Sequence, residues 1–302
     1  MILSAVVSGA IILDWLTGEP KRFHPLVGFG SVAGKLESSL NSGSPRWRKS
    51  KGLVALLILA VPLPLLWYIC QPYSWSWLGD LLLLWFSVGH RSLYDHIQPI
   101  ATALDTGDQE MARTLTSRVV SRDKEALNIE VSAVESTLEN GSDAIFAALF
   151  WFVLLGGAGA LFYRFVNTLD AMWGYRNLRF NDFGRFTAQL DDLLNLVPAR
   201  LTALTFALLG HTRQALSCWQ NQAHLLASPN GGPVMTSGAG ALGVLLGGAT
   251  RYQGQWQDKP YFGAGESPVT QDIRHALRLV SKTLALWVVI LWCTEGFVWL
   301  QA

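Results

Sequence analysis

A polar helical face is predicted in the middle of the chain. Its residues follow one another at intervals of three, four and three positions: Asn167, Asp170, Gly174 and Asn177. One continuous helix carries such positions on the same side, and the glycine leaves room between the polar side chains for a ligand. Carboxylates and amides in this arrangement can orient a substrate, so we interpret this face as part of a functional site.

A pair of glutamates offers metal chemistry. Glu135 and Glu139 are four residues apart, which places them on one face of a helix. Two carboxylates at this spacing repel each other unless a cation or an arginine lies between them. The pair therefore favours a magnesium site built from oxygen ligands, and a solvated helix surface is the alternative. Ser142 or Asp143 could cap the helix that follows.

Glycine-rich segments later in the chain offer anion binding. Residues 228–233 and 238–243 are rich in glycine, and Lys259 follows them. Exposed backbone amides in such turns can bind anions, and a lysine complements a phosphate as a point charge. We interpret residues 228–268 as loop; a glycine-rich loop without a ligand is the alternative.

The elements that must position these groups are membrane helices. Half of the 302 residues are hydrophobic and 15% are charged, against about 25% in ordinary soluble domains. A hydrocarbon core of about 30 Å needs about 20 apolar helical residues. We predict four full spans, at residues 1–16, 53–70, 77–89 and 283–300. The formal net charge of +1 gives no reason to expect a nucleic acid as partner.

The basic residues predict the topology. All 23 Lys and Arg residues lie in four segments, residues 17–51, 91–143, 164–200 and 213–282. Cytoplasmic loops collect Lys and Arg, so these segments are predicted to be cytoplasmic and both termini to lie outside. The apolar residues 144–163 would then form a re-entrant helix pair, broken at the glycines between Gly156 and Gly159. Five or six spans are the alternative.

These patterns together predict an all-α polytopic membrane protein, with residues 1–302 as a single integral-membrane domain. Residues 91–143 have apolar positions at helical spacing and predict a cytoplasmic helical segment, in which Thr106–Asp108 forms a turn. Residues 164–282 are predicted to be a cytoplasmic region of helices and loops that carries the site. Strand patterns are weak throughout.

These residues, in this order, resemble the adenosylcobinamide-phosphate synthases of cobalamin biosynthesis, the CobD/CbiB family. The resemblance covers Asp14 to Arg278, most of the chain. Its most specific parts are residues 134–140, 166–177, 190–203, 228–230 and 240–243. Gln189 stands where the family often has arginine.

The resemblance implies an ATP-dependent ligation. The reaction joins (R)-1-amino-2-propanol, or its O-phosphate, to the free propionate of adenosylcobyric acid, giving adenosylcobinamide or its phosphate. ATP, Mg²⁺ and the corrinoid substrate are expected ligands. The expected location is the inner membrane of a bacterial cell, with the site facing the cytoplasm. Membrane lipid and other late enzymes of the pathway are expected partners.

The resemblance also suggests roles for the polar residues. We expect Asp191 and Asp192, together with Glu135 or Glu139, to hold magnesium, with Asp170 taking part in the chemistry. The remaining expectations are that Arg176 and Lys259 neutralise phosphate charge, that Asn167 and Asn177 orient substrate, and that Ser228 and Asn230 line the corrin or nucleotide loop.

Two other classes of protein share the membrane pattern. A catalytically silent sensor on the same scaffold would have lost the acidic and amide residues, which are intact here. A transporter would show paired broken helices in two matching halves, and only one glycine-broken segment is evident in the sequence.

Overall fold

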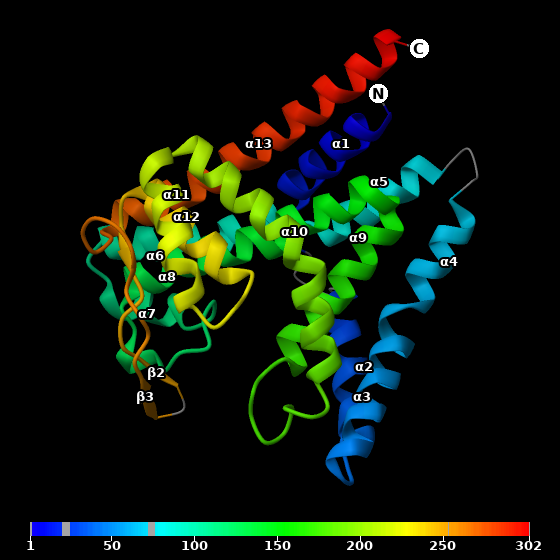
Figure 1. Cartoon of the computed structure of the whole chain (residues 1–302), viewed down its shortest axis with the longest axis horizontal. Coiled ribbons are helices and arrows are strands. Elements are labelled where there is room, and N and C mark those ends of the chain that lie inside the picture. Colours follow the sequence, from blue (N-terminus) through cyan, green and yellow to red (C-terminus); the bar gives the residue numbers. More distant parts are fainter. Residues whose placement is uncertain (1, 20–24, 72–75, 253, 302) are drawn as a thin grey trace. The chain divides into compact units, whose positions relative to one another are not determined.

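The computed structural model describes residues 2–19, 25–71, 76–252 and 254–301, and these form helices joined by loops and a few short strands (Figure 1). The chain divides into two compact units. Unit 1 is drawn from residues 1–89, 147–195 and 294–302, and unit 2 from residues 90–146 and 196–293. Each unit is therefore built from stretches that are far apart in the sequence.

Four helices are long and apolar enough to cross a membrane, which confirms the predicted all-α polytopic class. They are Pro45–Cys70 (α3, Pro45–Ala60, and α4, Pro62–Cys70), Ile129–Trp173 (α8, Ile129–Gly141, a π-helical turn at Ser142–Phe146, and α9, Ala147–Trp173), Arg185–Leu209 (α10) and Thr270–Gln301 (α13). The first and last of these contain the spans predicted at residues 53–70 and 283–300.

The other two long helices were not predicted as spans, and the spans predicted at residues 1–16 and 77–89 are not among the four. α1 (Ile2–Thr17) is a shorter apolar helix, and α5 (Ser76–Ser87) has 12 residues, about 18 Å at 1.5 Å per residue. Residues 144–163, which were predicted to form a re-entrant helix pair, belong to the long helix Ile129–Trp173, because the polar residues on both sides of them are also helical. The helix runs through residues 142–146 without a break, so the prediction that Ser142 or Asp143 caps a new helix was wrong.

The predicted break in the apolar segment is confirmed at Gly156. This residue has φ 63° and ψ −156°, a conformation inside α9 that is open essentially to glycine alone. The second half of α9 then begins with free amides, and the Asp80 carboxylate accepts the N–H of Gly157 at 2.9 Å and the indole N–H of Trp67 at 2.8 Å. Asp80 therefore caps the half-helix and stabilises the break.

Replacing Gly156 by alanine is expected to destabilise unit 1 by about 1–3 kcal/mol, the usual cost of a strained backbone conformation. The added Cβ would also lie 2.1 Å from Nε2 of Gln71. Thermal unfolding of the detergent-solubilised protein measures the change. Gly34→Ala, at a helical position with open space around it, is the matched control and should leave the melting temperature close to that of the wild type. Equal melting of the two variants would contradict the prediction.

Unit 2 confirms the helices predicted in residues 91–143. α6 (His90–Asp105) and α7 (Gln109–Thr116) are joined by a turn in which Gly107 has a positive φ. Asp108 caps α7 by accepting the backbone N–H of Met111 at 2.9 Å. The turn residues of the sequence therefore set the boundary between the two helices.

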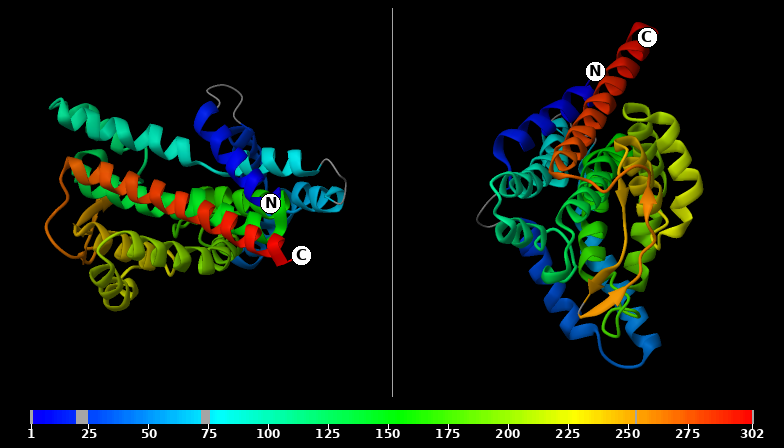
Figure 2. Two further views of the ribbon diagram at one scale, coloured as in Figure 1. Left: turned by 90° about the horizontal axis from the view of Figure 1, so that it is seen from above. Right: turned by 90° about the vertical axis from the view of Figure 1, so that its left-hand side faces the viewer.

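The prediction that residues 228–268 are all loop was wrong for α12 (Gly231–Leu242), which packs against α11 (Thr212–Gln222). A Cβ at Gly240 would lie 2.7 Å from Cα of Ala215, so the glycine allows the two helices to approach closely. The rest of the segment holds two antiparallel strand pairs: β1 (Leu245–Leu246) with β4 (Phe262–Gly263), and β2 (Thr250–Tyr252) with β3 (Gln255–Gln257), seen in Figure 2.

Candidate functional site

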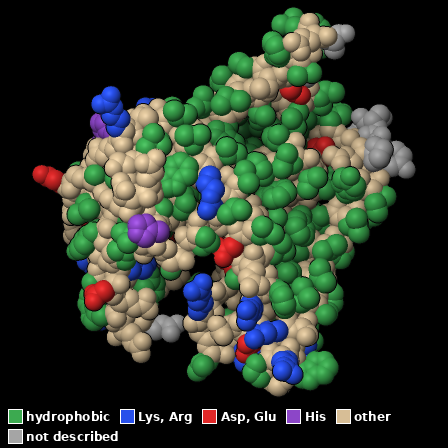
Figure 3. Space-filling model, viewed as in Figure 1, with side chains coloured by type: hydrophobic (Ala, Val, Ile, Leu, Met, Phe, Trp, Pro, Cys, Tyr) green, Lys and Arg blue, Asp and Glu red, His purple; other side chains and the backbone are tan. Residues whose placement is uncertain are grey.

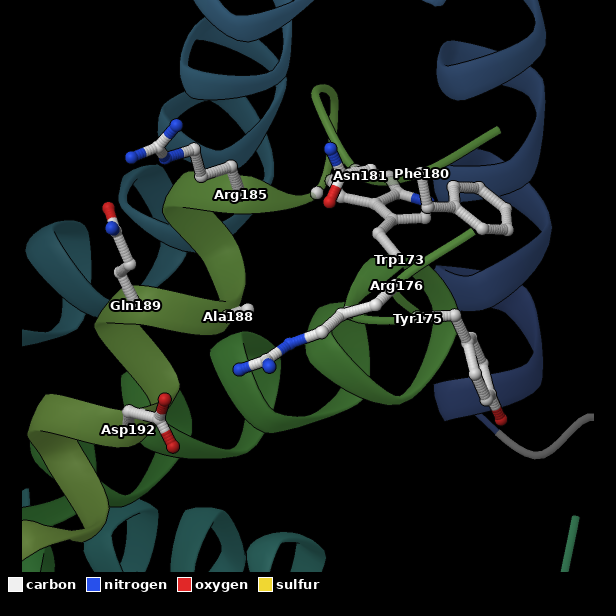
Figure 4. A pocket seen from close by; sticks show the side chains of 11 residues that line it. Trp173, Tyr175, Arg176, Phe180, Asn181, Arg185, Ala188, Gln189 and Asp192 are labelled. Carbon is white, nitrogen blue, oxygen red and sulfur yellow. The ribbon is translucent and has the colours of Figure 1, made fainter. Parts of the chain in front are cut away.

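Unit 1 contains a cavity of about 230 Å³ where α9 ends, the loop of residues 174–184 begins and α10 starts. Figure 4 shows Arg176 reaching from the loop toward the side of α10 that carries Gln189 and Asp192. The lining residues are Trp173, Gly174, Tyr175, Arg176, Phe180, Asn181, Gly184, Arg185, Ala188, Gln189 and Asp192. Arginine, aspartate and aromatic rings therefore meet in one space.

The two adjacent aspartates point in different directions. Successive helical residues are about 100° apart around the axis, and only Asp192 lines the cavity. Asp191 is 9% exposed and its carboxylate accepts the side-chain amides of Asn167, at 3.3 Å, and Asn195, at 3.0 Å. The Oδ1 atom of Asn195 in turn accepts the hydroxyl of Tyr163 at 2.9 Å. Asp191 thus ties α9 to α10, and Asp192 lines the cavity.

The predicted helical face holds only in its first half, because α9 ends at Trp173. Asn167 and Asp170 lie on the helix. The amide of Gly174 still bonds the carbonyl of Asp170 at 2.7 Å, and a Cβ at Gly174 would lie 2.1 Å from Oδ1 of Asp170. Gly174 is therefore required for Asp170 to fit beneath the loop.

Asn177 lies in the loop and not on a helix, which corrects the prediction for this residue. Its Oδ1 accepts the backbone N–H groups of Arg179 at 3.0 Å and Phe180 at 2.9 Å. This is a turn-stabilising role typical of asparagine. Asn177 does not belong to the cavity lining, so it shapes the loop that carries Arg176.

The loop is fastened to α2 (Pro25–Leu40) and α3. Arg179 pairs with the buried carboxylate of Glu37, and this hydrogen-bonded guanidinium holds the pKa of Glu37 below its usual range. A Cβ at Gly52 would lie 2.0 Å from the carbonyl oxygen of Phe183, so the loop backbone runs directly over α3. These contacts hold one wall of the unit 1 cavity in place.

Unit 2 contains a larger cavity, of about 420 Å³. Four of the predicted site residues come together in its wall, namely Glu135, Glu139, Ser228 and Lys259. The remaining lining residues are Arg122, Leu225, Leu226, Ala227, Met235, Gln257, Asp258, Pro260 and Phe262. Residues more than one hundred positions apart in the chain are thereby gathered around one space.

The two glutamates of this cavity have different surroundings. Glu135 is almost fully engaged: it pairs with Arg122 and accepts the backbone N–H of Gly247 at 2.8 Å. The side chain of Glu139, on α8, lies beside the start of α12. A Cβ on Gly231 would come within 3.0 Å of Oε1 of Glu139 and 3.2 Å of Oγ of Ser228. The glycine therefore keeps open a space beside the carboxylate and the helix N-terminus.

The other predicted site residues of unit 2 also differ in their hydrogen-bond partners and in whether they line the cavity. Oγ of Ser228 accepts the N–H of Gly231 at 2.9 Å and so caps α12. Lys259 donates to the hydroxyl of Tyr252 at 2.7 Å and stays in the cavity wall. Asn230 is buried and accepts from Arg200 at 2.8 Å, away from the lining.

Sequence reasoning missed Arg122 and Gln257 as lining residues and gave no role to Asp258. Arg122 comes thirteen positions before Glu135, and no local spacing indicates that the two side chains meet. Asp258 is adjacent to Lys259, so a search of the positions flanking that lysine would have found it.

The carboxylates of the two cavities decide whether the protein could hold Mg²⁺. Within the described ranges, no group of three or more His, Cys, Asp or Glu residues is placed to hold a metal ion. Mg²⁺ bound to nucleotides usually takes one or two carboxylates together with phosphate oxygens and water. Glu139 and Asp192, each beside a cation in a cavity, fit that pattern.

Comparison with known sequences places the chain in a family. The sequence model of the CobD/Cbib protein family matches residues 7–280. The cobalamin biosynthesis protein CobD of Stutzerimonas stutzeri is 50% identical over 94% of this chain and 95% of its own length. The proteins of the same name from Chromobacterium violaceum and Mycobacterium tuberculosis are 46% and 36% identical, each over 93% of both chains.

No solved structure matches this chain. The family match covers nearly the whole chain, and four helices among the described residues are long and apolar enough to cross a membrane. This chain is a membrane protein of the CobD/CbiB family of cobalamin biosynthesis.

Proposed function

We propose that this chain is an ATP-dependent amide ligase. It joins adenosylcobyric acid to (R)-1-amino-2-propanol or its O-phosphate, giving adenosylcobinamide or adenosylcobinamide phosphate. The observation that carries the proposal is the unit 2 cavity, where the carboxylate of Glu139 lies beside Lys259, Arg122 and the start of α12. Carboxylate oxygens beside cations are suited to magnesium and nucleotide phosphates.

The chemistry explains why phosphate binding is needed. A propionate does not condense with an amine in water, so the γ-phosphoryl group of ATP is transferred to the propionate oxygen, giving an acyl phosphate and ADP. The amine nitrogen then attacks the carbonyl carbon. The bond from this carbon to the phosphate oxygen breaks, phosphate leaves, and the amine gives up a proton. Magnesium would screen the phosphate charges during the first step.

The side chains divide between binding and positioning. In unit 2, Glu139 is the proposed magnesium ligand, and Lys259 with Arg122 neutralises phosphate. In unit 1, Asp192 and Arg176 provide the same combination of charges and are the second pair that we assign to magnesium and phosphate. Asp191 and Asn167 position α10 through their hydrogen bond, and Asp170 lies beside them at the end of α9.

The test is a reconstitution with purified protein in detergent. Adenosylcobyric acid, Mg²⁺ and each of the two amines are incubated with and without ATP, and the corrinoid product is identified by mass. We expect one ADP to form for each new amide. Absence of product with either amine, from protein that keeps its thermal unfolding transition, would reject ligation.

A genetic assay separates an enzyme from a silent sensor. A strain lacking this protein should grow under cobalamin-requiring conditions when given cobinamide, and should fail to grow when given cobyric acid. Rescue by cobyric acid would show that the amide is formed without this chain.

A further inference from the structure

Unit 1 carries a strongly basic surface at the end where α2 and α3 meet the loop of residues 174–184. Residues 35–51 contain five Lys and Arg residues and one acidic residue, and residues 174–185 contain three arginines and one aspartate. We call these two segments the basic patch. In Figure 3, Lys and Arg side chains gather at the lower end of the molecule, where Figure 1 places the α2–α3 turn.

Hydrogen bonds fix the two segments of the basic patch against each other. Arg48 donates to the carbonyl of Leu178 at 3.0 Å, and the side-chain amide of Asn41 donates to the carbonyl of Arg179 at 2.9 Å. Arg179 also pairs with Glu37. The positive charges are therefore held close together by the fold.

Several of these charges lack a protein counter-ion. In the part of the chain that the structure describes, Lys35, Arg46 and Arg185 take part in no ion pair, and all three are exposed. The two acidic residues of the patch are already engaged, Glu37 with Arg179 and Asp182 with Lys49 at 3.4 Å. Like charges held together without partners form a binding surface for anions.

Apolar side chains project from the same surface. Leu178 is 96% exposed and Trp47 is 66% exposed; Trp47 lies between Arg46 and Arg48, and Leu178 precedes Arg179. A soluble surface gives no reason to expose both, whereas tryptophan is enriched at the boundary between membrane and water. Pro45–Cys70 is long and apolar enough to span, so its first turn, with Arg46 and Trp47, belongs at the level of the lipid headgroups.

We propose that the basic patch binds the headgroups of anionic phospholipids, with Trp47 and Leu178 placed among the adjoining lipid chains. Clusters of Lys and Arg at the end of a membrane helix attract anionic lipid by about a factor of five in affinity for each basic residue. An acidic soluble partner would match the charges but not the exposed tryptophan and leucine. The loop that carries Leu178 also lines the unit 1 cavity, so a bound lipid would help to hold that wall.

The experiment titrates phosphatidylglycerol into delipidated protein in detergent and counts bound lipids by native mass spectrometry. We expect retained phosphatidylglycerol and little retention of phosphatidylcholine of the same chain length. Arg46→Gln should weaken phosphatidylglycerol binding about fivefold, and Trp47→Ser should weaken it further. Arg213→Gln, an exposed arginine of unit 2, removes one positive charge elsewhere and should leave the affinity unchanged.

Two further arms decide between sources of the anion and between partners. Inorganic phosphate and glycerol 3-phosphate should fail to displace the lipid, since they lack acyl chains; displacement by either would replace the proposal with a soluble phosphate site. Equal affinities for wild type and Arg46→Gln, or equal retention of the two lipids, would overturn it. Arg46 lies outside both cavities, so loss of lipid binding with normal amide formation would leave the proposed function intact.

Discussion

Asp192→Asn is expected to lower kcat for amide formation by about a hundredfold or more, the usual effect of removing one electrostatic contact to a transition state. Asp192 is the aspartate of the adjacent pair that lines the unit 1 cavity, and Arg176 reaches toward it. Asparagine keeps the size of the side chain, removes its charge and replaces one acceptor oxygen by an amide nitrogen. Product formation at saturating substrates, together with the Mg²⁺ concentration for half-maximal rate, measures the loss.

Asp95→Asn is the control for this variant. Asp95 is an exposed residue of α6 that pairs with Arg91 four positions earlier, so the substitution removes the same charge from a surface without a cavity. Its turnover should equal that of the wild type. Wild-type turnover in Asp192→Asn, in protein that folds normally, would remove Asp192 from the chemistry.

The neighbouring Asp191→Asn variant should behave differently. The Asp191 carboxylate accepts two side-chain amides in a buried position, and an asparagine there would turn its own amide nitrogen toward one of these donors. We expect a loss of about 1–3 kcal/mol of stability from the unsatisfied donor. The melting temperature should therefore fall further in Asp191→Asn than in Asp192→Asn.

The contrast between these aspartates shows what local sequence could predict. The break at Gly156 was predictable because a run of glycines in an apolar helix alters the backbone at that point, whatever lies around it. Asp191, and not Asp192, turns toward α9 because Asn167 of that helix bonds its carboxylate. The local sequence around the two aspartates does not show that Asn167 lies there, so it could not predict which aspartate lines the cavity.

The end of α9 at Trp173 is another tertiary effect. Gly184 packs against this helix end, since its Cβ would lie 1.8 Å from the carbonyl oxygen of Trp173. The loop that follows is held by Arg179 and Glu37, which are 142 positions apart in the chain. The regular polar spacing from Asn167 to Asn177 continues past the helix end, so spacing alone could not locate it.

α12 was missed for a related reason. Glycine and alanine are typical both of loops and of helices that pack at short distance. Residues 231–242 form a helix that packs against α11, and the close approach needs glycine at Gly240 because a Cβ there would meet Ala215. The membrane class was accessible from composition, since hydropathy is a property of each segment by itself. The unit 2 cavity, in contrast, needed contacts between segments more than one hundred positions apart.

Arg122→Met is expected to destabilise unit 2 by about 3–5 kcal/mol, the usual cost of leaving one member of a buried ion pair unpaired. The side chains of Arg122 and Glu135 are only 11% and 6% exposed, and Arg122 also donates to the hydroxyl of Ser132 at 3.0 Å. Loss of the arginine leaves a carboxylate inside the cavity wall. Thermal unfolding should show a lower transition, and hydrogen exchange should speed up in residues 243–262.

The double variant Arg122→Met with Glu135→Gln separates the unpaired charge from the lost contacts. The glutamine has no charge to leave uncompensated, and its oxygen can still accept the N–H of Gly247, which Glu135 accepts at 2.8 Å in the wild type. Most of the lost stability should therefore return, because removing both charges of a buried pair costs far less than removing one. A double variant no more stable than Arg122→Met would show that the stability is lost with the contacts of Arg122 and not through an unpaired charge on Glu135.

Activity should not return with stability in the double variant. Arg122 lines the unit 2 cavity beside Glu139 and Lys259, and its positive charge is part of the proposed phosphate environment. The cavity of the double variant would present one cation fewer to the nucleotide. The KM for ATP should therefore rise, while the melting temperature stays close to that of the wild type. If Arg122 only stabilised the fold, the double variant would have full activity once its stability is restored. That result would show that Arg122 has a structural role and does not bind ATP.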